Sequence, residues 1–409
     1  MMGITTPSGL AALVAALFPF AWLRASAGHG VIAAPPPPPP RPRACAQRIF
    51  AGSAVPLGLP RGARISLLGP GRITGGDYVA PARLEAPADA LVVVTEGRKA
   101  GAQSLRVLPA PHVRSTIASV DADCGVTLFD RATLRPLGTF VSSVAPADAA
   151  YVPGGLLWNG STAGTGTRYA AGAGLRPVPL GAAASTLLYA RGSRTLIQAD
   201  RDLDGTPGGT VTLARADGAR GRVSVGETPE GLAALGDGRV LITAANGDRV
   251  VEIDVRSGRV LRSLAVGERP FGIAVDPGRE RAFVALNSIA AMRPSHAGGV
   301  AEIDLRAWRV LRVRHDADLA LGIALDRARG HLFVTEELGR VLVLDENLRQ
   351  IHAPLHPCSL PWLPSIDSAT HRLFVPCPRK NRVAVYDLTS LRETARLKTA
   401  PYPLHVVLP

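Results

Sequence analysis

Residues 251–262 read VEIDVRSGRVLR, and residues 301–312 read AEIDLRAWRVLR. Each stretch is a short apolar strand that ends in an aspartate, followed by a polar turn and a second strand. The same pattern recurs in VLVLDENLRQI from Val341 and in VAVYDLTSLRETAR from Val383. The aspartates are spaced by 50, 41 and 42 residues, and they are Asp254, Asp304, Asp345 and Asp387. A repeat is therefore the main signal in this chain.

A second pattern repeats in phase with the first. GLAALGDGRVLITA begins at Gly231, FGIAVDPGRERAFVA at Phe271, LGIALDRARGHLFVT at Leu321 and LPSIDSATHRLFVPC at Leu363. Each of these is an apolar strand, a turn that contains Asp or Gly, and another apolar strand. One repeat thus predicts four short strands joined by tight turns. Four-stranded sheets that recur every 40 to 50 residues or so are typical of β-propeller blades.

Extending the period toward the N-terminus predicts seven blades. GVTLFDRATLRPLGTF from Gly125 fits the pattern with Asp130, which precedes Asp254 by 124 residues, close to three periods. Two blades must then lie between them. One has strands around Ala214, whereas the other, around residue 172, is rich in Gly and Ala and only weakly patterned. We predict an all-β, seven-bladed propeller of four-stranded antiparallel blades, and six blades with an irregular insert is the alternative.

The C-terminal residues suggest how such a ring would close. PYPLHVVLP, from Pro401, matches the first strand of a unit, and nothing follows to complete that unit. We expect this strand to pair with an N-terminal blade. The second strand of that blade would be ALVVVTEGR near Leu91, and its third and fourth strands would lie in 125–140. Such pairing removes open sheet edges.

The repeats resemble those of the YVTN family, seven-bladed propellers of exported bacterial and archaeal proteins, which are WD40-like. In that family, a Tyr-Val-Thr-Asn-like tetrad follows the pattern P-x-G-[IV]-A-[VL]-[DS]. Residues 270–276 here read PFGIAVD, and the tetrad-like segments are FVTE at 333–336, VVTE at 93–96, LITA at 241–244 and FVALN at 283–287. The resemblance is close over 223–409 and loose over 85–222. It implies a fold rather than an activity, because the family includes enzymes and binding modules.

The N-terminus resembles an export signal. The apolar run GLAALVAALFPFAWL spans residues 9–23, which is shorter than the stretch of about 20 residues that a membrane-spanning helix needs. Ala25-Ser26-Ala27 then offers a small-x-small cleavage site. No Lys or Arg precedes the run, and an uncleaved anchor is the alternative. We expect a periplasmic or extracellular protein with no stable membrane span after cleavage.

Six consecutive prolines, Pro35 to Pro40, predict an extended spacer without a core of its own. We therefore expect a signal peptide at 1–27 and a proline-rich linker at 28–48. An N-terminal arm at 49–84 and the β-propeller at 85–409 complete the expected organisation.

The formal net charge of +13 raises the question of a nucleic-acid partner. Three of the 46 basic residues are lysines, namely Lys99, Lys380 and Lys398, and the arginines are spread thinly along the chain. A nucleic-acid interface needs a clustered basic surface. We therefore expect no nucleic-acid partner.

The four cysteines are expected to form two disulfides, because export favours them. Cys358 lies just before the first strand of the last blade, and Cys377 ends its second strand. Antiparallel neighbours bring these two positions to one edge of the sheet, within bridging distance. The prediction is Cys358–Cys377, and Cys45–Cys124 follows by elimination.

Propellers usually bind ligands where the loops between second and third strands, and those between blades, meet the central channel. The candidate residues in these loops are Glu230, Asn287, His296, Glu336, His356 and Arg379, with Asn246 and Tyr402 nearby. Resemblance to the calcium-dependent gluconolactonase-like enzymes implies that Glu230, Asn287 and Glu336 could ligate one ion. The alternative is that all of them are solvated loop residues.

Residues 200–205 read DRDLDG, the opening of a calcium loop, with Asp200, Asp202 and Asp204 as candidate metal ligands. Position twelve is Val211 rather than the glutamate of an EF-hand, and an acidic hairpin turn is the alternative. Beyond this calcium ion, the sequence predicts no cofactor.

No nucleophile elbow, phosphate loop or dinucleotide fingerprint occurs in the sequence, so no catalytic residue is assigned. The leading hypothesis is a monomeric binding or scaffold module for a protein, a peptide or a cell-envelope ligand. The alternative is a metal-dependent lactonase or hydrolase with its site at the mouth of the central channel.

Overall fold

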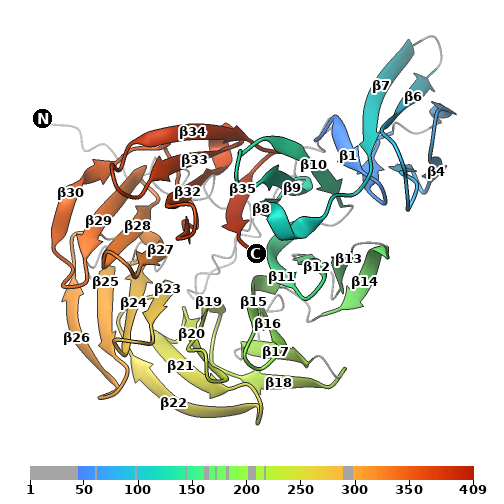
Figure 1. The fold of residues 1–409 in the computed structure, drawn as a ribbon. Coiled ribbons are helices and arrows are strands. Elements are labelled where there is room, and N and C mark those ends of the chain that lie inside the picture. Colours follow the sequence, from blue (N-terminus) through green and yellow to red (C-terminus); the bar gives the residue numbers. More distant parts are fainter. Residues whose placement is uncertain are drawn as a thin grey trace, which may run out of the picture. The chain divides into compact units, whose positions relative to one another are not determined.

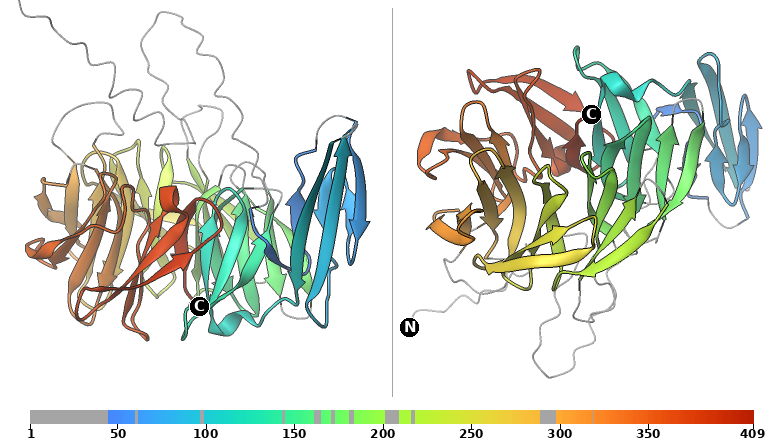
Figure 2. Two further views of the ribbon diagram at one scale, coloured as in Figure 1. Left: turned by 90° about the horizontal axis from the view of Figure 1, so that it is seen from above. Right: turned by 60° about the horizontal axis from the view of Figure 1, so that its bottom comes forward.

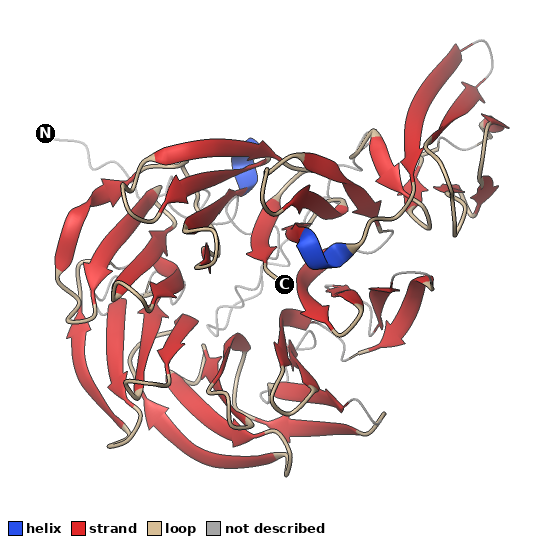
Figure 3. Cartoon of the chain, in the orientation of Figure 1, coloured by secondary structure: helices blue, strands red, loops and turns tan. Residues whose placement is uncertain are grey.

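The computed structural model describes residues 45–59, 62–96, 99–142, 145–160, 165–170, 173–180, 184–200, 209–215, 218–288, 298–317 and 319–409. Their secondary structure is almost entirely β (Figure 3). The described residues include two single turns of 3-10 helix, Val113–Ser115 and Pro378–Lys380. The predicted all-β class is confirmed.

Six four-stranded sheets follow one another along the chain, and within each sheet the strands pair in sequence order. All of the pairings in these sheets are antiparallel. The first three sheets are β11–β14 (Pro146–Val152, Gly155–Gly160, Thr165–Ala170, Gly174–Pro179), β15–β18 (Ala184–Ala190, Thr195–Asp200, Thr210–Arg215, Arg220–Ser224) and β19–β22 (Pro229–Ala234, Arg239–Ala244, Arg249–Asp254, Arg259–Ala265). The next three are β23–β26 (Pro270–Asp276, Arg281–Leu286, Gly299–Asp304, Arg309–Arg314), β27–β30 (Ala320–Asp326, His331–Glu336, Arg340–Asp345, Gln350–Leu355) and β31–β34 (Ser365–Asp367, Arg372–Cys377, Arg382–Asp387, Glu393–Lys398).

An eight-stranded sheet has the order β3-β6-β7-β1-β10-β9-β8-β35. In chain order its strands are β1 (Arg48–Phe50), β3 (Arg64–Leu68), β6 (Ala88–Glu96), β7 (Lys99–Leu108), β8 (Thr116–Asp121), β9 (Gly125–Asp130), β10 (Pro136–Val141) and β35 (Pro403–Val407). A small three-stranded sheet has the order β2-β5-β4, with bounds Ala54–Pro56, Asp77–Val79 and Arg72–Thr74. The stretch β35-β8-β9-β10 has the same antiparallel, four-strand layout as the six sheets above.

The first strands of the sheets lie side by side around a common centre (Figures 1 and 2). Each first strand contacts the next one, in the order β11, β15, β19, β23, β27, β31 and β35, and β35 in turn contacts β11. Strands β1, β3, β6 and β7 continue the eight-stranded sheet outward, away from this centre (Figure 1). The arrangement is that of a β-propeller.

One predicted neighbour of the C-terminal strand is wrong. The sequence suggested that the strand near Leu91 would pair with it, but β35 pairs with β8, and His405 lies opposite Val120. The strand that contains Leu91 is β6, which pairs with β3 and β7. The YVTN-like tetrad in β6 was misleading, because valine and threonine are common in any half-buried strand. The expected third and fourth strands are confirmed as β9 and β10.

The repeated aspartates at the ends of third strands fix the turns that follow. The Asp254 carboxylate accepts from the backbone N–H and the hydroxyl of Ser257, at 2.7 and 2.9 Å. Asp387 accepts from Ser390 in the same way, at 2.7 and 2.9 Å. Such bonds are Asx turns, in which a side chain replaces a backbone acceptor. The repeated aspartate, which is the strongest signal in the sequence, therefore stabilises the turn between the third and fourth strands.

Arginines join neighbouring sheets at several points. The guanidinium of Arg215 donates to the carbonyls of Val255 and Arg256 in the next sheet, at 3.2 and 2.6 Å. Arg262 donates to the Leu305 carbonyl at 2.9 Å and stacks 4.0 Å above the Trp308 ring. The fork of Arg131 binds both oxygens of Asp367 at 2.6 Å across 236 residues of sequence. Much of the arginine excess therefore serves sheet-to-sheet contacts.

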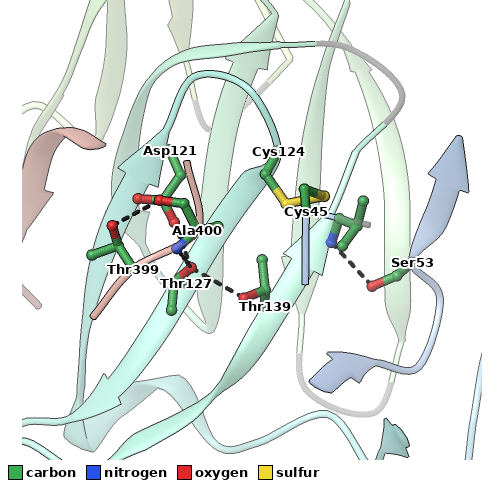
Figure 4. The surroundings of a disulfide bond; sticks show 9 residues. Cys45, Ser53, Asp121, Cys124, Thr127, Thr139, Thr399 and Ala400 are labelled. Atoms are coloured by element: carbon green, nitrogen blue, oxygen red, sulfur yellow. Dashed lines mark hydrogen bonds between the residues drawn. A yellow bond between two sulfur atoms is a disulfide. The ribbon is translucent and has the colours of Figure 1, made fainter. Parts of the chain in front are cut away.

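The four cysteines form the two predicted pairs, Cys45–Cys124 and Cys358–Cys377. Figure 4 shows the first of these disulfides beside Asp121 of β8, Thr127 of β9 and Thr139 of β10. Cys124 lies in the β8–β9 turn, so this bond attaches the segment before β1 to the sheet that receives β35. Ser53 adds a hydrogen bond to the same region, because its hydroxyl accepts from the Val141 N–H at 3.2 Å.

Candidate functional site

The loops that follow second strands meet the loops that join successive sheets. Three backbone N–H groups show this: Ala245 donates to Thr228 at 2.9 Å, Asn287 to Arg269 at 3.1 Å, and Glu337 to Leu319 at 3.2 Å. On the sheet that holds β35, the Ala122 N–H donates to the Tyr402 carbonyl at 2.9 Å. The two loop classes therefore share one face, as the sequence-based site hypothesis requires.

The joining loops carry a repeated backbone feature on this face. Thr228, Arg269 and Tyr402 have φ angles of 54°, 46° and 62°, in the left-handed region that non-glycine residues seldom adopt. Each lies next to or near the start of a first strand. Strained positions of this kind persist where the surroundings fix them, and they are frequent at functional sites.

Asn287 is fully buried and bonds to an acidic neighbour that the sequence did not single out. Its side-chain amide donates to Glu337 Oε1 at 2.9 Å, which joins the loops of two adjacent sheets. Burial raises the pKa of Glu337, against the opposing effects of the Asn287 hydrogen bond and the positive charge of Arg269. Arg269 in turn donates to Asn246 Oδ1 at 3.0 Å. Three successive sheets thus contribute to one polar chain.

Charged residues from distant parts of the sequence affect the phenol of Tyr402, which lies in the loop before β35. Burial raises the pKa of its phenol, the positive charge of Arg379 lowers it, and the carboxylates of Asp123 and Glu337 raise it further. Coulombic effects of this kind act over several ångströms and do not require contact between the groups. The Tyr402 backbone is itself fixed, since its N–H donates to Asn381 Oδ1 at 3.1 Å.

Next to Glu337, Leu338 projects into solvent. Its side chain is 70% exposed, more than that of any other large apolar residue in the described part of the chain. The next residue, Gly339, has a φ of 95° and approaches the backbone of Cys358, which is bonded to Cys377. We call Asn287, Glu337, Leu338, Arg379 and Tyr402 the mouth cluster.

The other predicted site residues have different surroundings. Glu336 is buried and forms an ion pair with Arg340, with Oε2 and Nε 2.7 Å apart. Glu230 is buried in β19, whereas His356 and Arg379 are exposed. His296 lies outside the described residues. The structure therefore joins Asn287 to Glu337 through a hydrogen bond, whereas Glu336 forms its ion pair with Arg340. Arg379 acts on Tyr402 through its charge.

The suggested calcium loop is described only at its first residue. Asp200 ends β16 and accepts hydrogen bonds from the Gln198 amide and from the Thr212 hydroxyl, the latter at 2.5 Å. Burial raises its pKa. Asp202 and Asp204 lie outside the described residues. Within the described ranges, no group of three or more His, Cys, Asp or Glu side chains is placed to hold a metal.

Two residues without any sequence signal form a second polar feature. His405 Nδ1 lies 2.8 Å from Asp148 Oδ1, which links β35 to β11, two first strands far apart in the sequence. Asp148 is buried, and it also accepts from the N–H groups of Ala149 at 2.8 Å and Leu187 at 2.9 Å. Only the pairing of β35 with β8 brings this histidine to the aspartate. No motif in the sequence could have identified the pair.

Comparisons with known proteins support the fold. No protein-family model matches the chain, and no curated protein sequence does. Among solved structures, it is similar to the dihydro-heme d1 dehydrogenase NirN in complex with DHE, with 15% identity and a TM-score of 0.54 over 77% of this chain and 72% of that one. A functionally unknown protein from Desulfotomaculum acetoxidans DSM 771 gives 14% identity and a TM-score of 0.59, covering 72% and 99% of the two chains.

Hydrazine synthase of Kuenenia stuttgartiensis is similar at 14% identity, with a TM-score of 0.57 over 68% of this chain and 93% of that one. Structural similarity at such low sequence identity indicates a shared fold and does not indicate a shared activity. Together with the six four-stranded sheets, these likenesses show a β-propeller. None of the described helices has the length and apolar character needed to span a membrane.

Proposed function

We propose that the protein is a binding module whose mouth cluster receives a protein or peptide partner, in solution or as part of the cell envelope. The observation that carries the proposal is the 70% exposed Leu338, in the same turn as a buried carboxylate that Asn287 holds in place. Aromatic residues and arginine are enriched at protein interfaces, and Tyr402 and Arg379 supply both. A partner would bury Leu338 and meet the charge of Arg379.

The test is a selection of peptides from a random library displayed on phage, with the mature protein as bait. We expect enriched peptides whose affinity falls roughly tenfold or more for Leu338→Asp and for Arg379→Ala, because interface anchors carry most of the binding energy. The matched control is Leu261→Asp, since Leu261 is 50% exposed on the outer strand β22. Binding that survives both mouth variants, or that fails equally in the control, would contradict the proposal.

We also propose the finer architecture, a closed ring of seven blades of the YVTN type. Six four-stranded sheets support it, together with the antiparallel pairing of β35 with β8 that makes a seventh unit of the same layout. An experimental structure of the mature protein would test the blade count. A deletion of residues 403–409 should abolish cooperative unfolding if β35 closes the ring.

Export is proposed on the predicted signal at 1–27 and on the two cysteine pairs, because disulfides persist in oxidising compartments. The boundaries of the linker at 28–48, the arm at 49–84 and the propeller at 85–409 stand as part of this proposal. Mass spectrometry of the protein from the cell envelope or the culture medium should find a new N-terminus after Ala27. An intact N-terminus there would favour the anchor alternative.

A metal-dependent lactonase or hydrolase remains the second candidate. The observation in its favour is the pairing of an amide and a carboxylate, Asn287 and Glu337, from different sheets, which is a ligand chemistry that suits calcium. Metal analysis of the purified protein tests both proposed calcium sites, with variants of Asn287 and Glu337 for the first site and of Asp200, Asp202 and Asp204 for the second. Metal-free protein that does not hydrolyse lactones would exclude this candidate.

A further inference from the structure

The strand β3 (Arg64–Leu68) forms one edge of the eight-stranded sheet. It pairs on one side with β6, with Ser66 opposite Val93 and Leu68 opposite Leu91. Among the described residues, no strand pairs with its other side. An unpaired edge presents a row of backbone N–H and C=O groups that can bind another strand.

The outermost strands of the six four-stranded sheets carry features that discourage such pairing. Strands β22, β26, β30 and β34 each shift register against their neighbours, which marks bulges. Strand β14 contains Pro177 and Pro179, and β18 exposes Arg220 and Arg222 within five residues. Bulges, prolines and closely spaced charges are the usual means of protecting an edge.

Strand β3 has neither a bulge nor a proline. Its five residues, RISLL, pair with β6 in unbroken register, and its one charge, Arg64, lies at the N-terminal end. Leu68 is 64% exposed, second only to Leu338 among the large apolar side chains described. An edge so regular and so apolar would be an aggregation hazard if it had no partner.

The two faces of this part of the sheet differ. One face packs against the small sheet, because Ile65 and Leu67 contact a core that contains Val55 and Tyr78. The opposite face carries Ser66 and Leu68, beside Val93 and Leu91, which are half-buried. A strand added to β3 would therefore extend both the hydrogen-bond ladder and this open apolar face.

Charge identifies the kind of strand that fits. Arg64 and Arg72 are both exposed, and neither guanidinium group forms an ion pair or a hydrogen bond with another described residue. Asp89, on the open face, is already paired with Arg106 at 2.5 Å. A second copy of a chain with a net charge of +13 would be repelled, whereas a negatively charged peptide would be attracted.

We propose that β3 binds an extended peptide of alternating apolar residues, with a carboxylate near Arg64, as an added strand of the eight-stranded sheet. This surface is separate from the mouth cluster. The backbone hydrogen bonds would supply affinity, and Arg64 together with Leu68 would select the sequence.

The test uses the full mature chain and a fluorescent peptide of alternating valine and threonine with an aspartate at each end. Two further peptides are N-methylated on every second residue, one on the odd set and one on the even set. A strand presents alternate N–H groups to each side. We therefore expect one methylated peptide to lose roughly tenfold or more in affinity and the other to bind like the parent.

Four variants distinguish strand pairing at β3 from binding elsewhere on the molecule. Leu68→Lys and Arg64→Glu should weaken binding, and Arg64→Glu should prefer a peptide with lysine ends. Leu261→Lys is the matched control on a bulged edge, and Leu338→Asp at the mouth should change nothing, so this test can fail or succeed independently of the proposed function. Circular dichroism verifies that each variant is folded.

Failure of the parent peptide to bind would overturn the proposal. Equal binding of both methylated peptides would also overturn it, because that result would indicate side-chain docking without strand pairing. Dimers of the chain that dissociate in Leu68→Lys would assign the edge to a second copy instead.

Discussion

From β19 to β34, arginines make recurring contacts between neighbouring sheets, whereas from β8 to β18 the described contacts come from aromatic rings, hydroxyl groups and the Asp148 carboxylate. Arg131 and Arg215 reach across the two borders between these regions. In the first region, which we call the arginine half, Arg262 and Arg312 reach the turns of the next sheet. In the second, which we call the aromatic half, the Tyr151 hydroxyl donates to the Thr116 carbonyl at 2.8 Å, and the Ser185 hydroxyl donates to the Pro229 carbonyl at 3.0 Å.

This difference explains why the sequence repeat is clear in the arginine half and weak in the aromatic half. Arg262 and Arg312 reach the next turn from the same position of successive repeats, eight residues after Asp254 and Asp304, and these aspartates also recur with the repeat. A cluster of rings depends on which large side chains meet, and it has no period. The sequence repeat therefore records the turn caps and the arginine contacts, rather than the four-stranded sheet itself.

The largest expected effect concerns the disulfide of the aromatic half. Its cysteines, Cys45 and Cys124, are 79 residues apart, and those of the arginine half, Cys358 and Cys377, are 19 apart. Loop-closure entropy then predicts that replacing both cysteines by serine lowers the free energy of unfolding by about 4.5 kcal/mol for the first pair and about 3 kcal/mol for the second. Urea unfolding of the two double variants measures the difference. A larger loss at Cys358–Cys377 would contradict it.

The next prediction concerns the ring cluster. Phe140 is fully buried, and its ring centre lies 4.7, 5.6 and 4.8 Å from those of Phe50, Trp158 and Tyr169. We expect Phe140→Ala to cost about 4 kcal/mol of unfolding free energy. Phe333→Ala, at an equally buried position of the arginine half, should cost about 1 kcal/mol less, because Phe333 is in none of the ring pairs found among the described residues. Equal losses in thermal or urea unfolding would mean that the ring pairs add nothing.

Asp121 should make the stability of the protein decrease as the pH rises from about 4 to about 8. Burial raises its pKa to about 8, although it accepts hydrogen bonds from Ser119 and Thr127. The folded protein keeps this proton between about pH 4 and 8 while the unfolded chain has lost it, so stability falls as the pH rises through that range. Asp121→Asn should remove this fall, gaining about 3 kcal/mol at pH 8 relative to pH 5. An unchanged pH profile would show that Asp121 is already ionised.

Asp367, in the arginine half, should show the opposite dependence. Burial alone would raise its pKa, but the hydrogen bonds and the charge of Arg131 hold it below the usual value. Its stabilising effect is therefore present above about pH 4 and is lost as the pH falls below it. We expect Asp367→Asn to cost about 2 kcal/mol at pH 7 and progressively less below pH 4, as measured by unfolding at a series of pH values.

The smallest effect is expected at Arg262. Arg262→Ala removes the stacking on Trp308 and one of the two cations that bind the buried Glu252, at a cost of about 1 kcal/mol. Arg262→Lys should not restore the loss, because an ammonium group lacks the planar fork. Arg259→Ala is the control, since this exposed neighbour has no described ion pair and its change should leave the melting temperature unaltered.

Sequence patterns were sufficient for the parts of the fold that depend on local chemistry. Asp254 and Asp387 cap turns through bonds to residues three positions later, so their spacing is visible in the chain. The pairing of β35 with the N-terminal part was also predicted, but its partner was misplaced. Strands near Leu91 and Ile117 are equally apolar, and only the fold decides between them.

The candidate site was predicted less well, for a physical reason. Asn287 and Arg379 were identified because they occupy the correct loops. From the sequence, Glu336 was selected and Glu337 was missed. The two are adjacent, and side chains of adjacent residues point in different directions in an extended chain, so they have different neighbours. Glu336 faces Arg340, and Glu337 faces Asn287. Asp148 and His405 meet across 257 residues, a separation that no local pattern can signal.

The hydrogen bond from the Ala400 N–H to the Thr127 hydroxyl joins positions 273 residues apart (Figure 4). A ribosome that adds about 5–20 residues per second needs about 15–55 s to make that length of chain. Throughout this interval, β35 has not been made, and the edge of β8 that it will occupy lacks this partner. During biosynthesis, the sheet that contains β8 can therefore be completed only after the last strand of the described chain has emerged.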